Sequence, residues 1–364
     1  MKKILVIKLR AMGDTVLMTA SLAELRRAFP RAEIHALALA PWHELLENHP
    51  AVDRVWSLAR PRERVARLRA LTRLGLQLRR ERFDCVVNLH ASPSSSLLSY
   101  ATGARRRAIH FHGLRDRDRF STVEIPDRGT VKPVIERDLD TLRALGVRVA
   151  APVMPAVFPH GHEIRSAQAW LEGIDARGPL LAIGLGASRA TKSWGSARFA
   201  EAAVGWASQL KDGAVLAVAG RGASEDAWVS EFSEALLHAP AEIRARVHVT
   251  QSLGIRELAA VLSRARVFLG NDSGPKHLAL SVGTPTVTLF GPEHPLEWHP
   301  YPRDRHPYFF IESLSCRRDA EPGLPPWCGI SECIEEKHRC MTEIQAAPVI
   351  AECLRTASLP RGSE

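Results

Sequence analysis

The segment GNDSGPKHLALSVGTPTVTLFG, residues 270–291, carries side chains that could hold an anion. A short apolar run ends at Asn271, so we expect a strand followed directly by the N-terminus of a helix near Ser273. The unpaired amides of that end bind phosphate, and Pro275 suits the first turn because its missing N–H is not needed there. A helix cap at Asp272 and a packed histidine at His277 are the alternative interpretation. The candidate residues for a phosphate or diphosphate site are Asp272, Ser273, Gly274, Lys276 and His277.

Two other polar stretches follow apolar runs of strand length. In RAMGDT the carboxylate is Asp14, and Gly13 before it allows a close approach to the backbone. Asp14 could cap the helix that follows, and Glu225 could be a solvated glutamate in a first helical turn. In GLGASRATKSW and AGRGASED the candidate polar side chains are Ser188, Thr191, Lys192 and Glu225.

The elements that must position these residues alternate between buried strands and helices. Apolar runs at 2–9, 32–39 and 83–89 are separated by helical patterns, the pattern weakens over 115–178, and it restarts at 178–187. This alternation predicts an α/β fold with parallel, doubly wound sheets, in which ligands bind beyond the carboxyl ends of the strands. We expect two Rossmann-like domains, residues 1–165 and 166–345, which face each other across a cleft. Residues 346–364 are expected to form a helix or tail that packs back on the first domain.

Charge is distributed unevenly along the chain. The net charge is +9, but residues 1–165 hold 29 Lys and Arg against 17 Asp and Glu, whereas the remainder holds 20 against 23. The excess lies in the arginine-rich stretch 60–83 and at 105–107. It indicates either an anionic partner, such as a phosphorylated substrate or a membrane surface, or a solvated helix face. Nucleic acid is disfavoured, because the stretch has no interleaved aromatic residues. No apolar run is long enough to cross a bilayer and no signal peptide is evident, which favours a cytoplasmic protein.

Three ordered motifs resemble glycosyltransferase family 9, the ADP-heptose:lipopolysaccharide heptosyltransferases and their relatives. The first is ILVIKLRAMGDTVLMTASLAELRRAFP, the second is GLGASRATKSWGSARFAEAA, and the third is GNDSGPKHLALSVGTPTVTLFGPEHP. The resemblance covers residues 3–345. It implies a GT-B architecture of two Rossmann-like domains, the first binding the acceptor and the second the sugar nucleotide, and an inverting transfer that needs no metal.

The resemblance also implies roles for single residues. Asp14 would be the base that deprotonates the acceptor hydroxyl, with Arg10 and Gly13 beside the acceptor. Lys192 would contact the donor phosphates and stabilise the leaving group, and Glu225 would bind the ribose. The other donor-binding residues would be Ser188, Thr191, Asp272, Ser273, Gly274 and His277. The implied reaction moves a heptose from ADP-heptose to the inner core of lipopolysaccharide, a phosphorylated glycolipid, by an enzyme peripheral to the cytoplasmic face of the inner membrane.

Departures from the family pattern leave other activities open. Arg189 and Lys276 add positive charge near the donor phosphates, so the sugar could differ. The acceptor could also be a protein hydroxyl, as in O-heptosyltransferases, and the cluster of cysteines near the C-terminus favours that alternative. A nucleotide-dependent oxidoreductase is disfavoured, because Arg189 stands at the third glycine of the G-x-G-x-x-G pattern. A non-catalytic binding protein is disfavoured by the retention of Asp14 and Lys192.

Four cysteines fall within one short segment: Cys316, Cys328, Cys333 and Cys340. Their spacing lacks a Cys-x-x-Cys pair, which argues against a zinc ribbon. Four thiols could still hold a structural zinc or iron, and free or partly buried thiols are the alternative. Catalysis itself is expected to need no cofactor.

Overall fold

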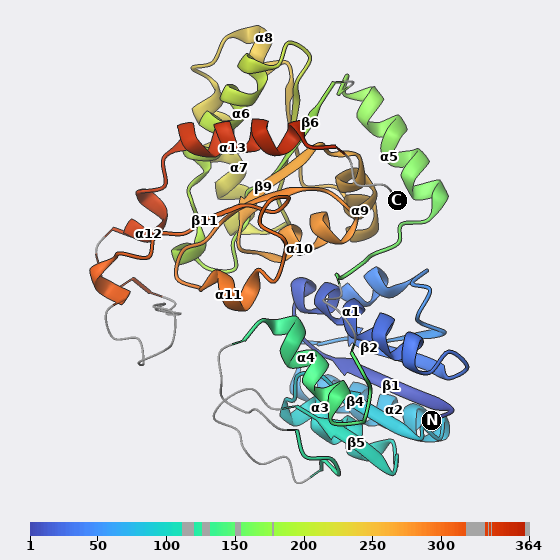
Figure 1. The fold of residues 1–364 in the computed structure, drawn as a ribbon. Coiled ribbons are helices and arrows are strands. Elements are labelled where there is room, and N and C mark those ends of the chain that lie inside the picture. The colour runs from blue at the N-terminus through green and yellow to red at the C-terminus, as the bar shows by residue number, and fades with distance from the viewer. Residues whose placement is uncertain are drawn as a thin grey trace. The chain divides into compact units, whose positions relative to one another are not determined.

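The computed structural model describes residues 1–110, 120–125, 132–149, 154–176, 178–317, 332–333, 335 and 337–360. The chain divides into two units, Met1–Phe158 and Pro159–Glu364 (Figure 1). Within the described ranges, no helix combines the length and hydrophobicity that crossing a bilayer requires.

The first unit contains a parallel sheet of five strands in the order β3-β2-β1-β4-β5. The strands are β1 (Lys3–Lys8), β2 (Glu33–Leu39), β3 (Arg54–Leu58), β4 (Cys85–Asn88) and β5 (Arg106–Ile109). β1 is buried along almost its whole length, as expected for a central strand covered on both faces. Helix α1 (Met12–Ala28) packs with α4 (Val134–Arg143) and with the 3₁₀ helix η1 (Trp42–Leu46), while α2 (Arg64–Arg80) packs with α3 (Pro93–Ala101).

The second unit contains a parallel sheet of six strands in the order β11-β10-β9-β6-β7-β8. The strands are β6 (Leu180–Gly184), β7 (Ala214–Val218), β8 (Val247–Thr250), β9 (Val267–Asn271), β10 (Thr286–Leu289) and β11 (Tyr308–Phe309). Its longer helices are α5 (Gly161–Gly173), α6 (Ser196–Gln209), α7 (Ala223–Leu236), α9 (Ile255–Arg264), α10 (Gly274–Ser281) and α13 (Ala346–Ser358). The short ones are η2 (Ala190–Lys192), α8 (Ala241–Arg244), α11 (Pro295–Trp298), η3 (Ser315–Arg317) and α12 (Arg339–Thr342).

The stretch in which the sequence pattern weakens contains two helices, α4 and α5. Helix α5 packs against α9, and its Glu163 accepts from Arg256 at 2.7 Å, so α5 belongs to the second unit. The chain therefore divides at Phe158 and not at the expected residue 165. Helix α13 packs on α6, β9 and β10 of the second unit, where its apolar face completes the core.

Both sheets reverse their winding direction at the centre. In the first, β1 lies between β2 and β4, and in the second, β6 lies between β7 and β9. The chain moves outward on one side of the starting strand, then returns to pair with its other side. At such a switch point the loops after two neighbouring strands diverge and leave a crevice for ligands. Ligand sites are therefore expected after β1 and β4 in the first unit and after β6 and β9 in the second.

Candidate functional site

In the second unit the site is built around Asp272, which directly follows β9. Its carboxylate accepts from Lys276 at 2.7 Å through Oδ1 and from Lys192 at 2.7 Å through Oδ2. Burial alone would raise the pKa of Asp272, but the charges of Lys276 and Lys192 outweigh that effect and hold this pKa far below its usual range. The three side chains carry one excess positive charge when all are ionised.

Lys276 is an internal part of this cluster. It is fully buried, donates to the carbonyl of Trp298 at 2.9 Å and lies 4.8 Å from the ring centre of Phe290. Burial lowers the pKa of Lys276, and the charge of Asp272 opposes the shift. Lys276 therefore contributes positive charge from within the core and holds Asp272 in place, whereas Lys192 is partly exposed.

Helix α10 begins where the sequence predicts, with Ser273 as its N-cap and Pro275 in its first turn. The Ser273 side chain makes no capping hydrogen bond, and among the described residues its buried Oγ has no hydrogen-bond partner. A buried hydroxyl without a partner is costly, so a ligand oxygen at this helix end would satisfy it. The hydroxyl and the amide-rich helix end suit an anion.

Asn271, the last residue of β9, ties the neighbouring loop to the strand. Its Oδ1 accepts from the backbone N–H of Trp194 at 3.0 Å, and its Nδ2 donates to the carbonyl of Gly186 at 3.3 Å. The loop after β6, which carries Lys192, is thereby fixed beside Asp272. This positioning role was not predicted from the sequence, although Asn271 lies inside the third motif.

Glu293 and Arg189 extend the cluster. They form an ion pair, and Glu293 Oε1 lies 3.9 Å from Lys192 Nζ. Burial raises the pKa of Glu293, while Lys192 and Arg189 oppose the shift. The positive charge of Arg189, expected from the sequence to add to that at the phosphates, is thus partly balanced by Glu293. The segment FGPEHP carries the signal for Glu293, since it follows β10 in the third motif.

The remaining donor-site candidates lie in different surroundings. His277 is buried in α10 with its Nδ1 2.6 Å from the hydroxyl of Tyr301, and burial lowers the pKa of His277 well below its usual value. It is therefore a neutral, packed histidine. Thr191 is buried in η2, whereas Ser188 is exposed. Glu225 is half-buried in the first turn of α7, after β7, on the strand edge that also carries Asp272.

In the first unit, Asp14 lies in the first turn of α1, just after β1. The residue is 8% exposed, and its Oδ2 is 3.6 Å from Nε of Arg10. The N-cap of α1 is Ala11, without a side-chain cap, so Asp14 does not occupy the capping position that was the alternative interpretation. Gly13 precedes Asp14 in the same turn. A carboxylate near a strand end, with limited exposure, can accept a proton from a bound hydroxyl.

His90, which follows β4, holds Arg10. Arg10 Nη1 is 2.9 Å from His90 Nε2, and because a guanidinium only donates, the imidazole accepts there. Burial lowers the pKa of His90 to about 3, and the Arg10 charge adds to the effect. The histidine is therefore neutral and fixes Arg10 across the β1–β4 switch point. His90 was not predicted from the sequence.

A buried ion pair lies beside these residues. Lys8, at the end of β1, donates to Asp138 of α4 at 2.5 Å, and both side chains are almost completely buried. Burial raises the pKa of Asp138 to about 6, with Lys8 opposing the shift and the charge of Asp14 adding to it. The pair connects the helix α4 to the central strand.

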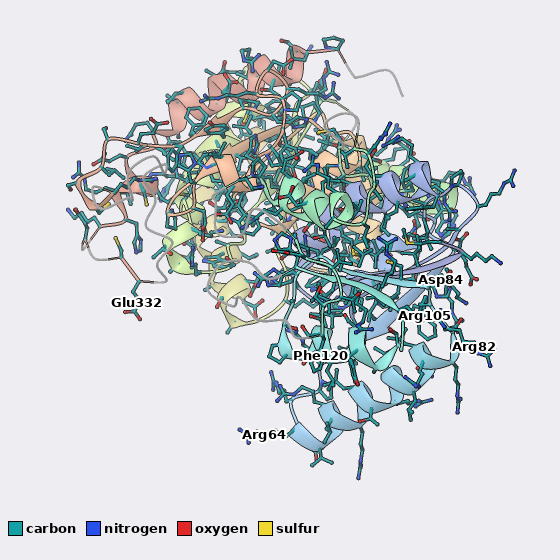
Figure 2. The ribbon with its side chains drawn as sticks, turned by 60° about the horizontal axis from the view of Figure 1, so that its bottom comes forward. Arg64, Arg82, Asp84, Arg105, Phe120 and Glu332 are labelled. Carbon is teal, nitrogen blue, oxygen red and sulfur yellow. The ribbon has the colours of Figure 1, made fainter. Side chains whose placement is uncertain are left out.

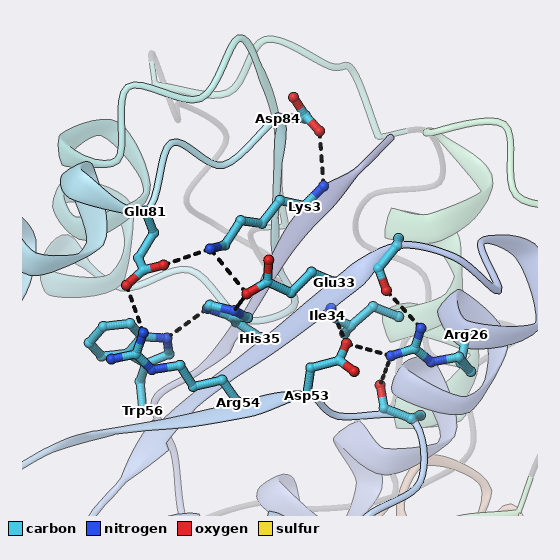
Figure 3. A network of polar contacts seen from close by, with 12 residues as sticks. Lys3, Arg26, Glu33, Ile34, His35, Asp53, Arg54, Trp56, Glu81 and Asp84 are labelled. Atoms are coloured by element: carbon cyan, nitrogen blue, oxygen red, sulfur yellow. Dashed lines mark hydrogen bonds and ion pairs between the residues drawn. The ribbon is translucent and has the colours of Figure 1, made fainter.

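One group of metal-ligand type is present among the described residues: Glu33, His35 and Glu81, near the starts of β1 and β2 (Figure 3). Lys3 already lies 2.6 Å from Glu81 and 3.1 Å from Glu33. His35 Nδ1 accepts from the indole of Trp56 at 3.0 Å, which leaves its Nε2–H to donate to Glu33. The three residues belong to an ion-pair network at the edge of the sheet opposite the carboxyl ends of the strands. Because Lys3 already pairs with both glutamates, this group does not suit a metal.

The cysteine segment contributes no metal centre within the described residues. Cys316, Cys333 and Cys340 are half-buried, and Cys328 lies outside the described residues. The single group of metal-ligand type found in the described part of the chain includes none of them.

Residues 71–319 match glycosyltransferase family 9 (heptosyltransferase). Lipopolysaccharide core heptosyltransferase OpsX of Haemophilus influenzae is 24% identical over 356 residues, 96% of each chain. Lipopolysaccharide heptosyltransferase 3 of Escherichia coli is 25% identical over 301 residues, 80% of this chain and 84% of that protein. The structure of E. coli ADP-heptose lipopolysaccharide heptosyltransferase II has a TM-score of 0.76 at 20% identity and covers 98% of both chains, which shows a shared fold. Since the family match covers more than half of the sequence, the chain belongs to glycosyltransferase family 9 and is a glycosyltransferase of GT-B fold.

Proposed function

We propose that this enzyme transfers a heptose from ADP-heptose to a hydroxyl group on the lipopolysaccharide inner core, with inversion at the anomeric carbon and without a catalytic metal. The first unit binds the acceptor and the second binds the donor. The observation that carries the proposal is the cationic cluster of Lys192, Asp272 and Lys276 beside the Ser273 hydroxyl, which has no hydrogen-bond partner among the described residues, at the start of α10. The names of the relatives OpsX and heptosyltransferase 3 support the sugar and the acceptor class.

The donor diphosphate is held by the second unit. Its oxygens accept from Lys192, from Ser273 and from the amides of the α10 N-terminus, while Asp272 keeps Lys192 in position. As the bond to the anomeric carbon breaks, negative charge grows on the leaving phosphate, and the fixed positive charge stabilises it. This arrangement supplies the electrostatic effect that a metal ion provides in other transferases.

Asp14 is the general base in this mechanism. The acceptor hydroxyl attacks the anomeric carbon from the side opposite the leaving group, and Asp14 takes its proton. Arg10, held by His90 and close to Asp14, is placed to bind an anionic group of the acceptor. Inversion follows from this single displacement.

The test combines binding and turnover. The purified protein is titrated with ADP-heptose, with other ADP-, UDP- and GDP-sugars, and with NAD, and transfer to core oligosaccharide is then measured with and without a chelator. We expect selective saturation by ADP-heptose, transfer that a chelator does not reduce, and a product of inverted anomeric configuration. Preference for another sugar nucleotide would reject the heptosyl assignment, and loss of activity with the chelator would reject metal independence.

The acceptor is tested separately. Core oligosaccharide and a serine-rich peptide are offered with the same donor, because a protein hydroxyl is the alternative acceptor. Transfer to the peptide alone would replace the lipopolysaccharide assignment. Metal analysis of the purified protein, alongside a Cys316→Ser variant, decides whether the cysteine segment holds zinc or iron.

A further inference from the structure

Exposed apolar side chains are concentrated on one pair of helices. Within the described residues eight large hydrophobic side chains are exposed, and five of them lie on α2 and α3, which pack together. Scattered single hydrophobic residues on a surface are ordinary, but a group on adjacent elements marks a binding surface. The five are Val65, Leu68, Leu76, Leu97 and Tyr100.

On α2 these residues form a row along the outer face. Leu68 and Leu76 are 63% and 58% exposed and lie two turns apart, with Thr72 between them. The opposite face buries Leu74 and Leu78 against the sheet. The helix therefore has two apolar faces, and the described residues of the unit cover one of them.

Arginines accompany the exposed row. Between Arg64 and Arg80 the helix contains six arginines and no acidic residue. Arg69, Arg73 and Arg80 line a shallow groove together with Leu68 and Leu76. Figure 2 shows Arg64 at the beginning of α2, Arg82 beyond its end, and the side chains of the helix projecting away from the ribbon.

We propose that the outer face of α2, together with Leu97 and Tyr100 of α3, docks on a lipid bilayer that carries anionic headgroups. A helix lying in the membrane interface presents apolar side chains to the acyl boundary, while arginines beside them reach phosphate groups. Charge complementarity selects this occupant: the charged side chains that line the groove beside Leu68 and Leu76 are all arginines, which matches a surface that is apolar below and negative above. The inference rests on the proposed function, in which the acceptor is a glycolipid.

This surface shares no residue with the proposed catalytic site. Helix α2 connects β3 to β4 and ends at Arg80, shortly before β4 starts, so its C-terminal half lies near the strand edge opposite Asp14. The arginine-rich stretch thus binds the membrane that contains the acceptor, and the acceptor sugar itself is left to Arg10 and Asp14.

The experiment is co-sedimentation of the full chain with vesicles of phosphatidylethanolamine containing one quarter phosphatidylglycerol, and with vesicles of phosphatidylcholine alone. We expect binding to the anionic vesicles only, weakened by salt. Leu68→Gln/Leu76→Gln and Arg69→Gln/Arg73→Gln should each lower the partition coefficient about tenfold or more. Leu237→Gln is the matched control, because Leu237 is 65% exposed but lies in the second unit.

Three results would overturn the docking proposal: equal binding to both vesicle types, unchanged binding of both double variants, or a solution dimer that only the leucine variant dissociates. Transfer to lipid-free core oligosaccharide is measured in parallel and should be the same for all these variants. Vesicle binding without any transfer would reject the proposed function and leave the docking surface intact. Transfer without vesicle binding would do the reverse.

Discussion

Each unit carries a buried lysine–aspartate contact beside the central strands of its sheet. In the first unit Lys8 donates to Asp138 at 2.5 Å, and in the second Lys276 donates to Asp272 at 2.7 Å. Burial acts to raise the pKa of both carboxylates. The net pKa of Asp138 is raised, whereas the net pKa of Asp272 is strongly lowered. The neighbouring charges differ: among the described residues Asp138 pairs with one lysine and lies near the negative charge of Asp14, whereas Asp272 pairs with a second lysine, Lys192, at 2.7 Å.

The balance of charge differs between the two sites, and each balance suits a different role. In the first unit Lys8 and Arg10 are balanced by Asp138 and Asp14, so the carboxylate of Asp14 is not surrounded by uncompensated positive charge. In the second unit two lysines share one aspartate, and the excess charge lies beside a helix N-terminus. A balanced site suits proton acceptance, and a cationic site suits a diphosphate.

The largest effect should come from replacing Asp14 with Asn. If Asp14 is the base, kcat for transfer falls by about 10² to 10⁴, while donor affinity is unchanged because the donor binds the other unit. Initial rates and a donor titration measure the two. Glu24→Gln is the matched control, since Glu24 is also on α1 and paired with an arginine, at 2.6 Å. Full activity of Asp14→Asn would show that Asp14 is not the base, and the first unit's site would then have no proton-accepting role to set against the cationic site of the second unit.

Replacing Asp272 with Ala tests the energetic side of the comparison. Lys276 would be left fully buried without its counter-charge, so the free energy of unfolding should fall by about 3–5 kcal/mol. Adding Lys276→Met should recover much of that loss, because a hydrophobic side chain needs no partner. Denaturant unfolding of the two variants measures both changes. If Asp272→Ala alone is as stable as the parent, Asp272 does not stabilise the buried Lys276.

Replacing Lys192 with Met removes the excess charge but keeps the Lys276–Asp272 pair. The transfer rate at saturating donor should fall by about 10² to 10³, since stabilisation of the leaving phosphate is lost. Steady-state kinetics measure this, and Lys211→Met, an exposed lysine of the same unit, provides the control. An unchanged rate would show that the excess charge is not used in the reaction.

The smallest effect is a pH dependence of stability. The pKa of Asp138 is raised to about 6 in the folded chain, and near pH 4 the unfolded chain releases its proton first. As pH rises from 4 to 6, the parent should therefore lose on the order of 2 kcal/mol relative to Asp138→Asn, which cannot titrate. Asp272 contributes in the opposite sense, because its lowered pKa gives stability above about pH 4 that is lost in acid. Urea unfolding at several pH values checks the sign, and a flat difference for Asp138→Asn would contradict it.

Local patterns were sufficient for the family and the architecture, and both predictions are confirmed. The apolar runs became buried strands, and the start of α10 at Ser273 follows from local capping rules. Helices α4 and α5 were not predicted from the sequence, because proline and glycine flank them. The unit to which α5 belongs depends on its contact with α9, which lies far along the chain.

The sequence by itself determined which residues stand at strand ends, since strand periodicity and helix capping act over a few neighbours. It placed Asp14, Lys192 and Asp272 at the edge where ligands bind, and their proposed roles await the experiments above. Only the tertiary structure decided which charges meet: Lys192 reaches Asp272 across 80 positions, and Lys8 reaches Asp138 across 130. Such contacts depend on how loops and helices pack over the sheet, and the pKa of each buried carboxylate follows from its burial and from the charges that this packing brings near it. No local pattern contains that information.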